Sequence, residues 1–467
     1  MNAQHLIVAG ALTASFLCNA LMQGLRRAAT PPAPSATPAT TSATAGPTPG
    51  DTGTTPSFIP PACATGVLPP VDPATRLAVH PTSEPNPEVA TRTQLRIVDG
   101  IVETVETAYV FTDFNGVDWP GLMAESRQRV QAGMETEIFY DEMRELIYAL
   151  GDDHSYFQSP TEVAADEAAL AGENDYVGIG VLVEPLPEDG RVVVLAVFPN
   201  SPAEREGLEA HDSLLAVDGD PIVEKGEAYP EWVRGPACSL VVLTVQTPGQ
   251  PPREVPLVRD RVQAPTPVQA ELVATDDDRR VGYLFLPHLF DETIPGQVEQ
   301  ALRDLAPLDG LILDNRKNTG GSSSVLDPLL GFFTSGTVGE FVSREGRRPL
   351  EVTADPVENS QTVPLVIIIG DLTASFGEIM SGVLRDVGRA QLVGETTEGN
   401  VEVLSGYVFE DGSNLWIAEE TFDPMWSDAD WEQEGIVPDV FAPGEWHTFT
   451  LEDDPAVRAA LEVLGDE

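Results

Sequence analysis

The alternation of apolar and polar positions divides the chain into a helical stretch, a mostly-β stretch and an alternating α/β stretch. Residues 94–111 and 137–151 place apolar side chains three and four positions apart, which predicts amphipathic helices. Residues 176–186 and 190–198 alternate around the turn "PEDG", which predicts paired strands. From residue 280 onward, apolar strands and amphipathic helices follow one another, which predicts an α/β layer with crossover connections.

Two buried strands of the α/β stretch are each followed by residues suited to catalysis. "GLILD" at 310–314 precedes "NRKNTGG", and "VPLVIIIG" at 363–370 precedes "DLTAS". Sites in open α/β sheets form beyond the carboxyl ends of the strands, so Ser375 is a candidate nucleophile. "SFGE" also fits a capping box, in which Ser375 caps the helix predicted over 376–388 and Glu378 reaches back. The two roles are compatible, because amides at a helix N-terminus also stabilise an oxyanion.

Two other motifs offer the remaining parts of a serine hydrolase site. "NTGG" at 318–321 is either an ordinary glycine turn or the source of an amide for the same oxyanion. His154 is either a cation well placed at a helix C-terminus or the base that a nucleophilic serine needs. His288, at the end of a predicted strand, is the second candidate for the base.

The segment "YVGIG" at 176–180 also has two interpretations. It is either an ordinary strand or, through the backbone amides of Gly178, Ile179 and Gly180, a site that holds a peptide carboxylate.

Composition and charge exclude several classes of function. The chain has 26 Lys plus Arg against 75 Asp plus Glu, a formal net charge of -49, which argues against binding a nucleic-acid backbone. Only Cys18, Cys63 and Cys238 are present, so there is neither a disulfide scaffold nor a CxxC metal motif. Cys63 and Cys238 either pair, if the protein is exported, or remain free thiols. No Cys/His cluster has ligand spacing, so we expect neither a metal nor an organic cofactor.

The N-terminal region indicates an extracytoplasmic protein, either secreted or membrane-anchored. Residues 6–22 form an apolar run that is short for a membrane span and fits a signal-peptide core. Arg26 and Arg27 follow this run and no Lys or Arg precedes it, a pattern closer to that of an anchor. Residues 28–60 are rich in Thr, Pro, Ala and Ser, which is typical of an extracellular tether.

In this order the motifs resemble the C-terminal processing (tail-specific) peptidases and, almost as closely, the tricorn-type branch of the same serine peptidase clan. The resemblance covers roughly residues 95–445. It rests on "YVGIGV", "VFPNSPAEREGLEAHDSLLAVDGDPI", "GLILDNRKNTGG", "DLTASFGEI", "LRDVGRAQLVGE" and "GIVPDV". It implies an α/β fold with a ClpP/crotonase-like protease core and a parallel-rich sheet, a mostly-β PDZ domain and an N-terminal helical segment.

This resemblance and the composition together predict six parts of the chain. They are a signal peptide or N-terminal membrane anchor at 1–27, a disordered linker at 28–92, a helical segment at 93–172, a PDZ domain at 173–262, a serine protease core at 263–455 and an acidic tail at 456–467.

The resemblance also implies roles for individual residues. The nucleophile of the family falls on Ser375, and its supporting acid falls on Asp386. The oxyanion glycine falls on Gly320 or Gly321, with the amide of Phe376 as its partner.

The family lysine is missing from this chain. Processing peptidases use a Ser–Lys dyad, with the lysine in a "GxxTFGK"-like loop, whereas "GETTEGNVE" places Asn400 there. An amide has no basic lone pair, so Asn400 cannot accept the proton of the serine. The chain has only two lysines, Lys225 in the PDZ region and Lys317 beside the oxyanion loop, and neither simply replaces the missing one.

The tricorn-type branch uses a histidine instead, and its motif falls on "LGDDHS" and hence on His154. An acid ahead of the "G-x-x-PD" motif supports the site in that branch, which indicates Glu432, with Glu434 second. Asp153 and Ser155 flank His154, and either is a candidate to orient its imidazole. A histidine with an ordinary pKa of about 6.5 is mostly neutral at pH 7, so it is suited to accept a proton.

The sequence therefore predicts a serine endopeptidase that works through an acyl-enzyme. Its partners would be peptides or proteins with a free C-terminus, held by Gly178, Ile179 and Gly180. Nucleic acid is not expected as a partner, and a membrane only through the N-terminal segment. The alternative is a catalytically inactive, peptide-binding pseudo-peptidase, because Asn400 replaces the family lysine. A surface or adhesion role for the acidic, Pro-rich chain is a third hypothesis, against which the core motifs argue.

Overall fold

The computed structural model describes residues 56–64, 66–71, 85–152, 154–173, 176–275, 279–427 and 429–465. The predicted signal peptide or anchor and most of the predicted linker lie outside these ranges. Within them, no helix combines the length and apolar character that crossing a membrane requires.

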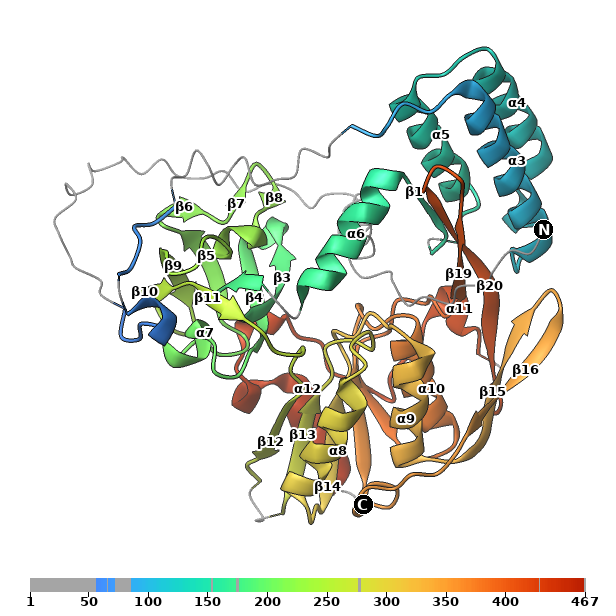
Figure 1. Cartoon of the computed structure of the whole chain (residues 1–467). Helices are drawn as coiled ribbons and strands as arrows, with labels where there is room; N and C mark the ends of the chain where they lie inside the picture. Colours follow the sequence, from blue (N-terminus) through green and yellow to red (C-terminus); the bar gives the residue numbers. More distant parts are fainter. Residues whose placement is uncertain are drawn as a thin grey trace, which may run out of the picture.

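Three amphipathic helices form a unit at the N-terminal side of the structure (Figure 1). They are α3 (Thr91–Ala108), α4 (Trp119–Gln131) and α5 (Thr136–Tyr148). Their apolar faces bury Ile97, Ile101 and Phe139 in one core, to which Leu415 and Ile417 of a distant strand also belong. The helical unit is therefore built partly from the C-terminal region of the chain.

A five-stranded antiparallel sheet makes this connection. In order it contains β1 (Tyr156–Gln158), β20 (Asn414–Pro424), β15 (Gly336–Ser343) and β16 (Gly346–Val352), and β19 (Val403–Val408) also pairs with β20. Tyr156 lies opposite Trp416 in the register. His154, two residues before β1, is consequently carried to the C-terminal part of the molecule.

Helix α6 (Pro160–Glu173) leads from β1 to a mostly-β domain, which Figure 1 shows in green. Its main sheet contains, in order, β10 (Arg253–Val258), β9 (Leu240–Gln246), β5 (Ser213–Val217), β4 (Arg191–Val197) and β3 (Val181–Leu186), with β6 (Asp220–Pro221) beside β5. The domain also contains the pair β2 (Tyr176–Gly178) and β11 (Asp260–Val262), the pair β7 (Val223–Glu224) and β8 (Glu227–Ala228), and the short helix α7 (Pro202–Arg205).

Part of the predicted linker is attached to this β domain. Cys63 and Cys238 form a disulfide bond, and Leu68 forms a β-bridge with Ser239. The backbone amide of Phe58 donates to Glu206. The disordered linker predicted over 28–92 is therefore wrong for these residues.

The C-terminal half forms a six-stranded, mostly parallel sheet. The strand order is β12 (Gln269–Val273), β13 (Val281–Phe285), β14 (Gly310–Asp314), β17 (Leu365–Ile369), β18 (Gln391–Gly394) and β21 (Val440–Phe441). All neighbouring pairs are parallel except β12 with β13. This arrangement agrees with the α/β core expected from the sequence.

Helices cover both faces of this sheet. Helices α8 (Ile294–Leu305), α9 (Ser323–Phe333) and α10 (Phe376–Asp386) pack on one face, where Leu311, Leu313 and Ile367 point. Helix α12 (Pro455–Gly465) packs on the other face with the alternate residues of the strands. The acidic tail predicted from residue 456 is therefore wrong up to residue 465, because apolar side chains of α12 are buried against the sheet.

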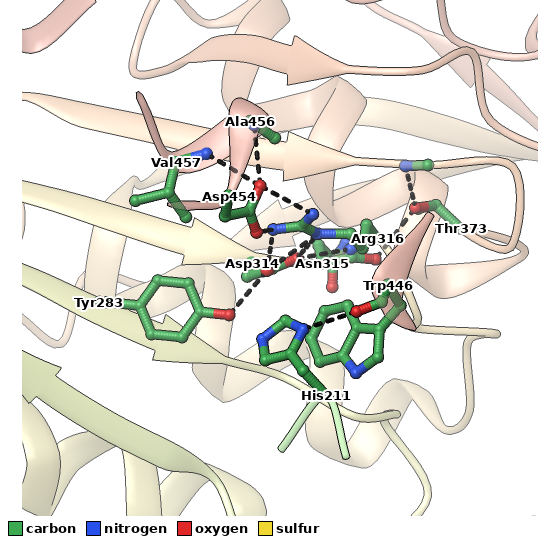
Figure 2. A network of polar contacts seen from close by, with 11 residues as sticks. His211, Tyr283, Asp314, Asn315, Arg316, Thr373, Trp446, Asp454, Ala456 and Val457 are labelled. Atoms are coloured by element: carbon green, nitrogen blue, oxygen red, sulfur yellow. Dashed lines mark hydrogen bonds and ion pairs between the residues drawn. The ribbon is translucent and has the colours of Figure 1, made fainter. Parts of the chain in front are cut away.

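Figure 2 shows a buried polar network at the carboxyl ends of the strands. Arg316 forms ion pairs with Asp314 at 2.7 Å and with Asp454 at 2.5 Å, and the Tyr283 hydroxyl donates to Asp314 at 2.7 Å. Because each buried charge has a partner of opposite sign, this end of β14 is rigidly fixed.

The β domain reaches the same network. His211 stacks on Trp446 with ring centroids 4.1 Å apart, and its Nδ1 lies 2.9 Å from the Trp446 carbonyl oxygen. The Arg316 guanidinium lies over the Trp446 ring at 5.2 Å. The β domain is thus in contact with the strand end from which residues 318–321 follow.

Candidate active site

Ser375 lies at the sharp turn between β17 and α10. Its backbone has φ 52° and ψ −126°, a left-handed conformation that side chains other than glycine rarely adopt. The Ser375 amide donates to the Asn400 carbonyl at 2.7 Å, which helps to hold this turn. The residue is partly exposed, so its hydroxyl is accessible. Strain of this kind is concentrated at functional sites, where the fold imposes it on one residue.

The predicted capping box is absent. The Ser375 side chain makes no capping hydrogen bond. The fully buried carboxylate of Glu378 instead accepts from the Thr397 hydroxyl, from the Gly399 amide at 2.9 Å and from the Asn400 amide at 2.8 Å. Glu378 therefore ties the loop that contains Asn400 to α10, and the Ser375 hydroxyl is not used to cap the helix.

A chain of amides positions the glycine loop opposite Ser375. Asn315 donates to the Gly377 carbonyl at 2.8 Å, and Asn318 donates to Asn315 at 2.7 Å. The Gly320 amide in turn donates to Asn318 Oδ1 at 2.9 Å. Gly320 has φ 96°, and a Cβ there would lie 2.6 Å from the Ser375 Cβ. Only glycine fits at this close approach.

This geometry corrects the choice of Gly320 as the oxyanion donor. The Gly320 amide already donates to Asn318. The alternative, Gly321, forms a parallel β-bridge with Leu289 in which the hydrogen bonds are made by Gly320 and Ser322, so the Gly321 amide is not used. Within the described part of the chain, neither the Gly321 amide nor the Phe376 amide has a hydrogen-bond acceptor. These two amides remain the candidates for an oxyanion hole.

His154 is held through its backbone. Its amide donates to Asp152 Oδ1 at 3.0 Å, and the Ser155 hydroxyl donates to Asp152 Oδ2 at 2.6 Å. Ser155 Oγ also accepts the Ala418 amide of β20 at 2.9 Å. Ser155 thus fixes the chain beside the imidazole and does not orient the ring itself, while Asp153 lies outside the described residues.

The His154 imidazole faces a carboxyl group that the sequence analysis did not identify. Its Nδ1 lies 3.4 Å from Glu402 Oε2, and 18% of the His154 side chain is exposed against 0% of that of Glu402. Burial lowers the pKa of His154, while nearby carboxylates, Asp152 first among them, act in the opposite direction. A neutral imidazole is the form that accepts a proton.

Glu432 lies behind Glu402. The short helix α11 (Trp431–Glu434) carries it, and its Oε2 accepts the Val401 amide at 2.9 Å. Burial raises the pKa of Glu432 to about 10, and the charge of Glu402 adds to the effect. Glu432 therefore belongs to the group of carboxyls around His154, and the charges of Glu432 and His154 also act on each other. Glu434 is exposed and is not part of the site.

One signal in the sequence could have indicated Glu402. It lies between Val401 and Val403, and an acidic residue in a buried apolar run is unusual unless it has a partner.

Asn400 lies beside Ser375, as the resemblance to the family implied. Its carbonyl accepts the Ser375 amide, its own amide donates to Glu378, and the residue is 9% exposed. Lys317 cannot act in its place, because its ammonium group forms an ion pair with Glu184 of β3 at 3.0 Å.

Two other predicted residues lie elsewhere. Asp386 is the last residue of α10, ten residues beyond Phe376, which at 1.5 Å per residue is about 15 Å along the helix. The prediction that Asp386 supports the site is therefore wrong. His288 is buried, its Nδ1 accepts the Phe290 amide at 3.1 Å, and burial lowers its pKa to about 4. The Nδ1 atom of His288, the second candidate for the base, is therefore already in use.

Gly178, Ile179 and Gly180 form the turn between β2 and β3. The Ile179 carbonyl accepts the Ala203 amide at 2.8 Å and the Gly180 carbonyl accepts the Phe198 amide at 3.0 Å, so both carbonyls point into the domain. The Tyr176 ring folds over Gly178, since a Cβ there would lie 2.8 Å from Tyr176 Cε2.

The surroundings of Tyr176 are electropositive. The Arg234 guanidinium lies 4.7 Å from the centre of its ring. Burial raises the pKa of Tyr176, while the Arg234 charge and the amides of Val181 and Gly180 act against this rise. The amides of Gly180 and Val181 and the Arg234 guanidinium thus act on the Tyr176 hydroxyl at this turn.

Comparison with known proteins agrees with this architecture. Residues 280–441 match the model of Peptidase family S41. The carboxyl-terminal-processing protease of Picosynechococcus sp. is 29% identical over 370 residues, which cover 77% of this chain and 86% of the relative. That of Synechocystis sp. is 29% identical over 369 residues, which cover 77% and 84%. The solved structure of a photosystem II D1 C-terminal processing protease, 26% identical, superposes with a TM-score of 0.51 over 78% of this chain and 99% of the other.

Residues 280–441 thus match a serine peptidase domain of family S41. Over most of its length the chain is similar to carboxyl-terminal-processing proteases, which supports a serine-type peptidase of the C-terminal processing kind.

The buried carboxyl groups make stability depend on pH. Burial raises the pKa of Glu378 to about 7, of Glu402 to about 8 and of Glu432 to about 10, from an ordinary 4.5. Between pH 4.5 and these values the folded state binds more protons than the unfolded state. The free energy of unfolding contributed by these groups is therefore complete below about pH 4.5 and decreases as the pH rises through this window.

Replacing Glu432 with Gln removes one of these titrations. We expect Glu432→Gln to match the wild type in melting temperature at pH 5 and to exceed it by at least about 2–4 °C at pH 9, measured by calorimetry. Glu434→Gln, on the same short helix but exposed, should change neither value. If the melting temperatures of Glu432→Gln and the wild type differ by the same amount at pH 5 and at pH 9, Glu432 is ionised in the folded protein.

Proposed function

We propose that this protein is an extracytoplasmic endopeptidase in which Ser375 is the nucleophile and His154 the general base, without the lysine of its family. The observation that carries the proposal is the accessible Ser375 hydroxyl at positive φ, beside the unbonded Phe376 amide and the glycine loop. A strand–turn–helix position of this kind presents a serine to substrate and its helix amides to an oxyanion.

The reaction follows as acyl transfer. The Ser375 oxygen bonds to the peptide carbonyl carbon while His154 Nε2, the nitrogen away from Glu402, takes the hydroxyl proton. The amides of Phe376 and Gly321 donate to the oxyanion. His154 then protonates the leaving amine as the C–N bond breaks, which leaves an ester on Ser375. A water molecule, deprotonated by His154, hydrolyses this ester, and the proton returns to Ser375.

We further propose that the β domain is a PDZ domain and binds the C-terminal carboxylate of the substrate. A peptide carboxylate on the amides of Gly180 and Val181 would replace the Tyr176 hydroxyl near the exposed Arg234. The names of two relatives, both carboxyl-terminal-processing proteases, support substrates that are processed at their C-termini.

An extracytoplasmic location is supported by the disulfide. Bonds such as that between Cys63 and Cys238 persist in oxidising compartments and are rare in the cytosol.

The expected result is that a peptide with a free C-terminal carboxylate is cleaved with a KM at least about tenfold lower than its C-terminal amide, since a charge-assisted hydrogen bond contributes about 1.5–3 kcal/mol. Arg234→Ala should raise KM for the free acid and leave KM for the amide unchanged. Lys225→Ala, which removes an exposed cation of the same domain, serves as the control.

Mass spectrometry of the cleaved peptides gives both constants. Equal KM values for acid and amide would reject carboxylate recognition, and no cleavage of either peptide would reject the peptidase itself.

A further inference from the structure

Glu402 is placed directly behind the proposed base. It precedes β19, its side chain is fully buried, and its Oε2 lies 3.4 Å from His154 Nδ1. Among the ion pairs of the described residues, Glu402 has His154 as its partner and no Lys or Arg. The separation slightly exceeds a well-formed hydrogen bond and would be closed by a small movement.

The carboxyl of Glu402 also interacts electrostatically with that of Glu432, and among the described residues both buried oxygens of Glu402 lack a hydrogen-bond partner. Glu432 is fixed at this place by the amide of Val401, the residue immediately before Glu402. Two carboxylates so close in a buried site repel each other strongly, so one proton is shared between them.

We propose that Glu402 is the positioning residue for the His154 base and that Glu432, carrying the shared proton, holds Glu402 in place. This inference rests on the proposed function of Ser375 and His154. An ionised Glu402 accepts the Nδ1–H of His154, which selects the tautomer whose Nε2 is free to take the Ser375 proton. Glu432 acts only as a neutral donor to Glu402.

All the charged groups that face His154 are acidic. They are Asp152 on its own segment, Glu378 on α10, Glu398 and Glu402 on the loop before β19, and Glu432 on α11. The hydroxyl of Tyr109, near Asp152, Glu402 and Glu432, stays protonated because burial raises its pKa. Ionising Glu402 among these acidic groups is therefore unfavourable. A catalytic carboxylate that lies near a cation loses its proton at a lower pH.

The pH dependence of the reaction follows from this arrangement. Burial already keeps His154 neutral near pH 6.5, so protonation of the imidazole does not limit the rate there. Glu402, whose pKa burial raises to about 8, must lose its proton before it can accept from Nδ1. The value of kcat/KM should thus increase with pH through about 8.

The test is the pH profile of kcat/KM between pH 5 and 10, with fluorescein-labelled casein as substrate and the Ser375→Ala variant as background. We expect Glu402→Gln to lower kcat by at least about 100-fold, because a carboxylate partner of a catalytic histidine contributes up to about 10⁴-fold. The step near pH 8 should disappear in this variant. Glu402→Asp should recover part of kcat together with the step.

Glu432→Gln separates this account from one in which Glu432 is the acid of the site. Its amide still donates to Glu402 and still accepts from Val401, so we expect kcat within about tenfold of wild type and the step retained. Glu434→Gln should be unchanged. A step near pH 8 that persists in Glu402→Gln, or a loss in Glu432→Gln as large as that in Glu402→Gln, would overturn the proposal.

A second readout does not depend on turnover. NMR of ¹⁵N-labelled histidine, with the His154 signal assigned by its loss in His154→Ala, reports the tautomer directly. Nδ1–H is expected in the wild type at pH 9, and its loss is expected in Glu402→Gln. An unchanged tautomer would reject the role of Glu402. A wild type that shows this tautomer but has no Ser375-dependent activity would instead reject the proposed function and leave the positioning intact.

Discussion

Replacing Ser375 with Ala should abolish hydrolysis of labelled casein, with kcat/KM reduced by about 10⁴-fold or more. In the proposed reaction this hydroxyl forms the acyl-enzyme, whereas the other hydroxyl on the turn between β17 and α10, that of Thr373, is buried and donates to the Asn315 carbonyl. Ala occupies the same backbone conformation and removes only the oxygen, so the melting temperature should stay within about 2 °C of the wild type.

Ser375→Gly provides the matched control for the fold. It should be equally inactive and more stable than Ser375→Ala, because glycine adopts φ 52° without strain. Residual activity above about 1% in either variant would show that Ser375 is not the nucleophile. A collapse in melting temperature of both would indicate that the serine is needed for structure instead.

His154→Ala should reduce kcat by about 10³-fold or more, since general base catalysis typically contributes 10²–10⁴-fold. The same substitution at His288 is the control, because that imidazole is also buried but its Nδ1 is used by the Phe290 amide. His288→Ala should retain kcat within a few-fold. The comparison is made by stopped-flow hydrolysis of one peptide at pH 8.5.

Restoring the family lysine provides a second test of the assignment of His154 as the base. An Asn400→Lys ammonium would lie among Glu378, Glu402 and their neighbours, which hold it charged and unable to accept a proton. Asn400→Lys should therefore fail to restore activity to His154→Ala. Restoration, or His288→Ala inactivation as deep as that of His154→Ala, would contradict the assignment of the base.

The parallel part of the fold was predictable because its central strands are buried along their whole length and apolar at most residues. Each of the strands β13, β14 and β17 is a continuous buried run followed by an amphipathic helix. This pattern is typical of a parallel sheet covered by helices. The antiparallel sheet of β15, β16, β19 and β20 was not predicted. β20 pairs with β1 and β15 across large sequence separations, and most side chains of these strands are partly buried or exposed, so the local pattern carried little information about this sheet.

The helix α12 was missed for a different reason. The segment ends in acidic residues, which favour an exposed tail, whereas Val457, Ala460 and Leu464 have the apolar spacing of a helix. In the structure this spacing matters more, because the second face of the sheet has to be covered.

The site was predictable to the extent that it follows from position in the chain. Ser375, Asn400 and the glycine loop lie at ends of neighbouring strands, so sequence order alone brings them together. Glu402 was not found, because its importance arises from the approach of β1 to β20, which places His154 beside it. Asp386 was assigned from resemblance alone, and the length of α10 places it too far away.

The central claim is that Ser375 is activated by His154 without a lysine. The most direct measurement is the rate at which a fluorophosphonate probe labels the protein at pH 8.5, with the modified residue identified by mass spectrometry. The account predicts a single adduct on Ser375, formed at least about 100 times more slowly in His154→Ala and at the wild-type rate in His288→Ala. No adduct on Ser375 in the wild type, or an undiminished rate in His154→Ala, would contradict it.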